Sequence, residues 1–360
     1  LISVPRLPTT SALQDSTTKA VATELETQGM QDRQFTVILL LSIAYSASIG
    51  GVATIIGTPP NLVLAAQFAR LFPDMPEITF AKWMVIGVPF STTFLLVAWY
   101  YLTRIYADLP DVSVTPTQSV VRDKLEELGP LSRAEKRVST VFVLTVAAWI
   151  FREPIRFGLF TVPGWASSLG ISEYVHDSTV AVLASLLLFL IPGGDSRGEP
   201  LLDWDHAVEI PWGVLILFGG GLALADGFES TGLSQWAGNQ LLILKALPLL
   251  LVILALCLLM TFLTEVTSNT ATTTILLPIL AGAATTLALD PRYLMIPAAM
   301  SASCAFMLPV ATPPNAIIFG SDRLTIPDMG KAGLWLNLAG IVLVTFFSYT
   351  LVGVMFASLN

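Results

Sequence analysis

Hydroxyl side chains and one asparagine amide are clustered in the stretch Thr264–Thr274, which reads Thr-Glu-Val-Thr-Ser-Asn-Thr-Ala-Thr-Thr-Thr. Apolar runs flank it on both sides, from Leu247 to Leu263 and from Ile275 to Leu280. Polar groups inside a membrane are costly unless each finds a partner there. The cluster therefore predicts a binding site for something polar at membrane depth.

Oxygen atoms of hydroxyl, amide and backbone carbonyl groups are the ligands that a hard cation such as sodium prefers. The polar stretch offers such side chains, and backbone carbonyls become free wherever a membrane helix is interrupted. The predicted sodium ligands are Thr264, Thr267, Ser268 and Asn269, together with Ala311 and Gly57 at two interruptions described below. This set holds the cation without a buried charge.

An anion is attracted to the start of a helix, where free N–H groups and the positive end of the helix dipole meet it. Helices are expected to begin after Asn269 and after Pro313. The side chains predicted to bind carboxylate oxygens are those of Ser268, Asn269, Thr270, Thr58 and Thr312. These stretches contain no arginine, which suits a site that releases its ligand.

Other interpretations of the same residues stay open. Clusters of Ser, Thr and Asn in membrane helices often only hold helices together. Glu265 is either a carboxylate that couples transport to protons or a residue at the water-facing mouth of a hairpin. Asn61 and Asn315 are expected to cap the helices that follow them. The two cysteines, Cys257 and Cys304, lie in apolar runs and are read as small hydrophobic residues.

One motif is duplicated: Gly57-Thr-Pro-Pro-Asn61 returns as Ala311-Thr-Pro-Pro-Asn315. Ser46-Ala-Ser48 precedes the first copy and Ser301-Ala-Ser303 precedes the second. Proline interrupts a helix interior but suits the first turn of a new helix, so each copy predicts a membrane helix that is broken in the middle. Paired broken helices indicate the midplane binding site of a transporter built from inverted repeats.

The amino-acid composition indicates the class of protein to which these residues belong. The chain has 360 residues, of which 54% are hydrophobic and 12% charged. Several apolar runs approach the roughly 20 residues that cross a bilayer as a helix. We therefore expect an all-α polytopic membrane protein in a lipid bilayer. No run of Lys or Arg suggests a nucleic-acid partner.

The elements are expected in a definite order along the chain. Six basic residues between Arg104 and Arg137 indicate that this connection is cytoplasmic. The start at Leu1 gives the first repeat no polar tip of its own, so we expect the chain to be the C-terminal portion of a longer protein. The expected elements are a polar loop (1–34), the first broken helix (35–71), a helix and cytoplasmic loop (72–137), scaffold-type helices and loops (138–209), a glycine-containing helix and an interfacial helix (210–246), a re-entrant hairpin with a Ser-Asn-Thr tip (247–290), the second broken helix (291–321) and a C-terminal helix (322–360).

Three motifs carry a family resemblance. They are Ser268-Asn-Thr270, the segment from Ser46 to Asn61, and Leu308-Pro-Val-Ala-Thr-Pro-Pro-Asn-Ala-Ile317. Together they resemble the divalent-anion/sodium symporters, which are the di- and tricarboxylate and sulfate carriers. The resemblance covers nearly the whole chain from Phe35 onward.

The resemblance implies a homodimer whose transport domain moves against a scaffold domain as an elevator. It implies that Ser268, Asn269 and Thr270 contact the substrate with Thr312-Pro313, and that Thr58-Pro59 faces it from the first repeat. It also implies one sodium site from Thr264, Thr267, Asn269 and Ala311, and a second site to which Gly57 belongs.

The sequence thus predicts a secondary active transporter that is multi-pass in the plasma membrane. Its expected activity is the sodium-coupled symport of dicarboxylates similar to succinate or malate, or of citrate. The alternatives are a sodium-independent dicarboxylate exchanger and a truncated subunit that does not transport. An enzyme does not fit, because the polar stretch contains no His or Asp to act as base for a nucleophile.

Overall fold

The computed structural model describes residues 33–106, 129–157, 160–194, 199–240 and 245–357, and these are predominantly helical. Six of the described helices are long and apolar enough to cross a membrane. This confirms the expected polytopic, helical membrane protein. The predicted polar loop at the N-terminus and much of the predicted cytoplasmic loop lie outside the described residues.

The chain forms two compact units. Among the described residues, the first comprises those within 33–78, 82–106 and 215–357, and the second those within 79–81 and 129–214. The helices that lie wholly or mostly in the first unit are α2 (Arg33–Gly51), α3 (Pro59–Leu71), α4 (Phe80–Tyr100) with the π-helical turn η1 (Tyr101–Tyr106), α10 (Trp212–Ser230), α11 (Leu233–Gln240), α12 (Leu249–Val266), α13 (Asn269–Leu287), α14 (Arg292–Ala302), α15 (Pro313–Phe319) and α16 (Ile326–Ala357).

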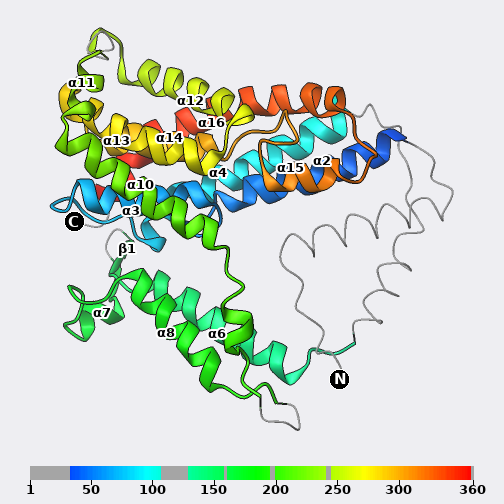
Figure 1. Ribbon diagram of the computed structural model, residues 1–360, viewed down its shortest axis with the longest axis vertical. Helices are drawn as coiled ribbons and strands as arrows, with labels where there is room; N and C mark the ends of the chain where they lie inside the picture. Colours follow the sequence, from blue (N-terminus) through cyan, green and yellow to red (C-terminus); the bar gives the residue numbers. More distant parts are fainter. Residues whose placement is uncertain (1–32, 107–128, 158–159, 195–198, 241–244, 358–360) are drawn as a thin grey trace. The chain divides into compact units, whose positions relative to one another are not determined.

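The second unit is built around a helix pair (Figure 1). Its elements are α6 (Arg133–Ile150), the antiparallel strands β1 (Ile155–Phe157) and β2 (Phe160–Val162), α7 (Trp165–Ser168), α8 (Asp177–Leu190) and α9 (Trp204–Ala207). Arg152 is buried and pairs with Asp177 at 2.9 Å, which ties the end of α6 to the start of α8. α8 has 14 residues, fewer than the roughly 20 that cross a bilayer as a helix.

Both predicted broken helices are present in the first unit. α2 ends at Gly51 and α3 begins with Pro59-Pro60, while α14 ends at Ala302 and α15 begins with Pro313-Pro314. Each proline pair occupies a first helical turn, where its missing N–H costs nothing. The second break starts at Ser303, five residues before the motif that begins at Leu308. The helix ends early because backbone groups near Phe306 find partners outside the helix, as described below.

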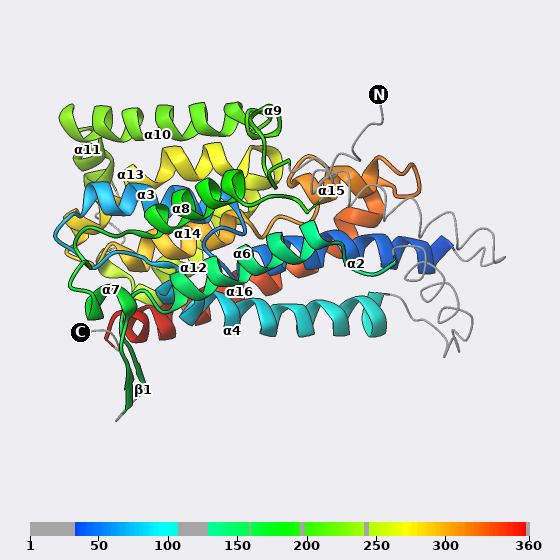
Figure 2. The same cartoon turned by 90° about the horizontal axis from the view of Figure 1, so that it is seen from below.

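α12 and α13 form a helical hairpin, and Thr267-Ser268 is its tip. Both arms pack against α14, which lies between them in Figure 2. The arms have 18 and 19 residues, so each is long enough to cross the membrane, and the re-entrant arrangement stays a prediction. The predicted interfacial segment contains α11, and this helix packs closely against α13. A methyl group on Gly238 would lie 2.8 Å from the Gly282 carbonyl oxygen.

Candidate functional site

The first break is held by three side-chain donors. The Trp83 indole N–H donates to the Val52 carbonyl at 2.9 Å, and the Ser91 hydroxyl donates to the Ile49 carbonyl at 2.8 Å. The Asn61 amide donates to the Thr54 carbonyl at 3.0 Å. Carbonyls at a broken helix have lost their intrahelical donors, so these contacts satisfy the exposed backbone and fix its path.

The second break is held in a related way. The Asn315 amide donates to the Leu308 carbonyl at 3.1 Å. The Phe306 N–H donates to Asn337 Oδ1 at 3.0 Å, and the Tyr45 hydroxyl donates to the Phe306 carbonyl at 2.8 Å. Phe306 is completely buried, so the unwound segment is anchored by its ring as well as by its backbone.

The supports of the two breaks recur at a constant separation. Asn61 and Asn315 are 254 residues apart, and so are the carbonyls of Thr54 and Leu308 to which they donate. Both asparagine amides therefore contact the unwound segment before them, and their expected role as helix caps is wrong. In the second copy the helix start is capped by the Thr312 hydroxyl, which accepts from the Asn315 N–H at 3.3 Å.

The two breaks touch each other through Thr58 and Ser303. The Ser303 hydroxyl donates to Thr58 Oγ1 at 3.1 Å, and Ser303 is buried. This bond leaves the Thr58 hydroxyl hydrogen available for another acceptor. Sequence reasoning did not identify Ser303 as a site residue, although the repeated Ser-Ala-Ser motif contains it.

Glu265 connects the hairpin to the second break. Its carboxylate accepts from the N–H groups of Met307 and Leu308 at 2.9 Å each and from the Asn337 amide at 2.6 Å. The residue is only 3% exposed, so its interpretation as a water-facing mouth residue is wrong. The partner Asn337 was missed, because it lies in an otherwise apolar helix that carries no recognisable motif.

Most hydroxyls at the hairpin tip are engaged locally. Thr264 donates to the Met260 carbonyl at 2.9 Å, and the Thr267 hydroxyl lies 2.7 Å from both the Leu263 carbonyl and the Thr272 hydroxyl. Each donated bond uses the hydrogen and leaves oxygen lone pairs free. Ser268 caps α13 by accepting from the Ala271 N–H at 3.4 Å.

Three buried amide oxygens lie at the tip and the breaks without a hydrogen-bond partner. They are Oδ1 of Asn269, Asn61 and Asn315, each unpartnered within the described part of the chain. A buried oxygen without a donor is costly, and a cation removes that cost. These atoms therefore fit oxygen coordination of sodium. The described residues contain no group of three or more His, Cys, Asp or Glu that would suit another metal.

The other predicted site residues occupy the expected segments. Ala311 and Thr312 are buried in the second break, and Pro59 and Pro313 open α3 and α15. Across the residues that the structure describes, no side-chain hydrogen bond joins Ser268, Asn269 or Thr270 to either break. The hairpin is connected to the second break instead through Glu265, which lies three residues before Ser268.

Gly57 allows a close backbone approach within the first break. A methyl group on Gly57 would lie 2.1 Å from the Gly51 carbonyl oxygen, which forces the backbone to move. We expect Gly57→Ala to destabilise the protein by about 1–3 kcal/mol, as overpacking does. Thermal unfolding of the purified protein measures this effect.

Gly50→Ala is the matched control for this prediction. Gly50 lies in α2 near the same break, and nothing approaches its added methyl group within 4 Å. The substitution should leave stability unchanged or raise it, because alanine favours helix. Equal melting temperatures for the Gly57 and Gly50 variants would contradict the close approach.

Comparison with known proteins shows the family to which the sequence belongs. Residues 6–357 match the model described as the sodium:sulfate symporter transmembrane region. The chain is 44% identical over 321 residues to the sodium-dependent dicarboxylate transporter SdcS of Staphylococcus saprophyticus, covering 89% of the chain and 59% of that relative. It is 42% identical over 328 residues to SdcS of Staphylococcus aureus, covering 91% and 61%. The chain thus spans about 60% of the length of these relatives.

Proposed function

Because the chain belongs to the sodium:sulfate symporter family, we propose that it serves the sodium-coupled symport of dicarboxylates across the plasma membrane. The observation that carries this proposal is the unpartnered, buried Oδ1 of Asn269 at the hairpin tip. The similar proteins named above are sodium-dependent dicarboxylate transporters, which favours a dicarboxylate over sulfate as the anion. Citrate, a tricarboxylate, would bind through the same carboxylate chemistry.

Sodium is proposed to bind at two places. One site takes oxygens from Thr264, Thr267, Ser268, Asn269 and Ala311, and Gly57 contributes a carbonyl to the other. Support comes from the amide oxygens that lack partners at the tip and breaks and from the buried position of Thr264 and Ala311. Sodium bound there would satisfy groups that the protein leaves unpaired.

The anion is proposed to bind next to these cations. Asn269 begins α13, whose N-terminus offers N–H groups and a positive dipole end to carboxylates. α3 begins with Pro59-Pro60, which have no N–H, so its N-terminus contributes its positive dipole end. The proposed contacts are Ser268, Asn269 and Thr270 at the tip, Thr58 and Pro59 at the first break, and Thr312 and Pro313 at the second. The bond from Ser303 to Thr58 supports this, since it directs the Thr58 hydrogen away from Ser303.

Transport is proposed to follow an elevator mechanism in a homodimer of inverted repeats. The constant separation of the asparagine supports in the two breaks favours a structural repeat. All proposed site residues belong to the first compact unit, and the predicted scaffold segment (138–209) belongs to the second. This division agrees with a transport domain that carries the site and a separate scaffold.

Labelled succinate uptake into proteoliposomes tests the proposal. The protein, in the longest form that its gene encodes, should accumulate succinate when a sodium gradient points inward and not when potassium replaces sodium. Excess unlabelled succinate should compete more strongly than sulfate. Uptake that ignores sodium but requires internal dicarboxylate would replace symport by exchange, and no uptake under either condition would favour a non-transporting subunit.

A further inference from the structure

Pro278 leaves one carbonyl inside α13 without its helical partner. In an α-helix the carbonyl of residue i accepts from the N–H of residue i+4. Residue 278 is proline, which has no N–H, so the Thr274 carbonyl receives nothing from its own helix. Thr274 is only 2% exposed, and water therefore does not supply the missing donor.

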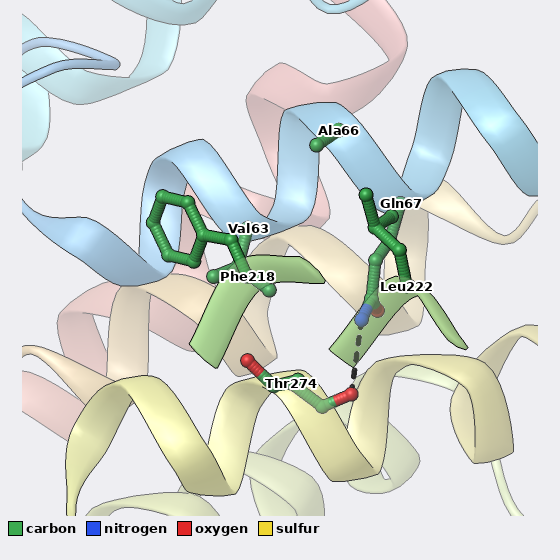
Figure 3. A pocket seen from close by; sticks show the side chains of 6 residues that line it. All are labelled: Val63, Ala66, Gln67, Phe218, Leu222 and Thr274. Atoms are coloured by element: carbon green, nitrogen blue, oxygen red, sulfur yellow. Dashed lines mark hydrogen bonds between the residues drawn. The ribbon is translucent and has the colours of Figure 1, made fainter. Parts of the chain in front are cut away.

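Gln67 of α3 supplies that donor. Its Nε2 donates to the Thr274 carbonyl at 3.0 Å, across 207 residues of sequence, and its side chain is 2% exposed. Figure 3 shows this bond reaching from α3 to the backbone of α13. The Gln67 amide and Pro278 are thus complementary, because the proline removes a hydrogen-bond donor from the Thr274 carbonyl and the amide replaces it.

The surrounding pocket favours a structural role for this pair over a ligand site. The pocket has a volume of about 20 Å³ and is otherwise lined by Val63, Ala66, Phe218 and Leu222. Sites for organic ligands usually measure about 300–1,000 Å³. The pocket is therefore too small for an ordinary organic ligand.

We propose that Gln67 is a positioning residue, which locks α3 to α13 through the carbonyl freed by Pro278. α3 begins beside Thr58 and α13 begins at Asn269. The lock fixes one helix against the other, and with them the two helix ends that face the anion. This inference rests on the proposed function for its effect on anion affinity, while the lock itself is independent of it.

A double-mutant cycle with Pro278 tests the lock. Gln67→Met keeps the volume but removes the donor, and Pro278→Ala returns an N–H to the Thr274 carbonyl. We expect Gln67→Met alone to lower the melting temperature by roughly 2–4 °C, about the effect of one unsatisfied buried carbonyl. In the Pro278→Ala background the same substitution should cost less than half as much. Gln235→Met, at an exposed position of α11, controls for the change of residue type.

Succinate uptake by the same variants, in the longest form that the gene encodes, tests the positioning role. Gln67→Met should raise the KM for succinate roughly tenfold, which corresponds to about 1.4 kcal/mol, with little change at saturating succinate. Pro278→Ala should not restore the affinity, because it satisfies the Thr274 carbonyl within α13 without reconnecting α3. A purely stabilising role predicts fewer active molecules and an unchanged KM.

The possible outcomes separate this inference from the proposed function. Equal losses of melting temperature in both backgrounds overturn the lock. A normal KM in Gln67→Met, measured beside robust wild-type uptake, overturns the positioning role. Absence of uptake in the wild type contradicts the proposed function, and the melting-temperature cycle then still decides whether the lock exists.

Discussion

Replacing Glu265 by glutamine is expected to destabilise the protein by about 1–3 kcal/mol, the usual cost of leaving a buried hydrogen-bonding group unsatisfied. The carboxylate accepts from the N–H groups of Met307 and Leu308 and from the Asn337 amide. A glutamine offers only one oxygen, and its NH₂ group would face donors. The second break would lose its attachment to α12 and α16, so uptake should fall together with the melting temperature.

Thermal unfolding and succinate uptake check this prediction on the same preparations. Glu229→Gln is the matched control, because Glu229 lies exposed near the end of α10. Its substitution should change stability by no more than about 0.5 kcal/mol. A Glu265→Gln protein that melts with the control and retains uptake would show that the carboxylate does not hold the break.

Asn269→Ala is expected to separate activity from stability. Its Oδ1 has no hydrogen-bond partner in the described structure, so its loss should cost little folding free energy. If the same oxygen binds sodium, sodium-driven succinate uptake should fall at least tenfold, which is about 1.4 kcal/mol of lost binding. Asn239→Ala, at an exposed position of α11, should leave both properties unchanged.

Uptake and melting temperature measured in parallel decide between the outcomes. A loss of both in Asn269→Ala would assign the residue a structural role like that of Glu265. Unchanged uptake would remove Asn269 from the site. The contrast between the two variants matters, since they lie four residues apart in one hairpin yet are expected to fail for different reasons.

Local chemistry made the broken helices predictable from the sequence. A proline pair excludes the helix before it and favours the helix after it, so Pro59 and Pro313 mark helix starts without reference to any distant residue. The hairpin was similarly evident, because a polar stretch interrupts two apolar runs. These elements could therefore be predicted from the local sequence, while the start of the second break could not.

Contacts between segments that are distant in the sequence could not be predicted from local sequence patterns. Glu265 and Asn337 are 72 residues apart, and Ser303 and Thr58 are 245 apart. Their meeting depends on how helices pack, which no local pattern encodes. Glu265 consequently had two open interpretations, one of which burial removes. Pro278 indicates from the sequence alone that the Thr274 carbonyl lacks its helical donor, but nothing in the sequence identifies Gln67 as the donor that replaces it.

The most direct test of the proposed sodium-and-anion site at the tip and breaks is calorimetric titration of succinate into the purified protein. Measured in sodium chloride and in potassium chloride, it should give saturable binding in sodium that weakens at least tenfold in potassium. Asn269→Ala should bind weakly in both salts. Equal affinity in the two salts, or wild-type affinity in the variant, would contradict a site in which this hairpin tip joins sodium to the anion.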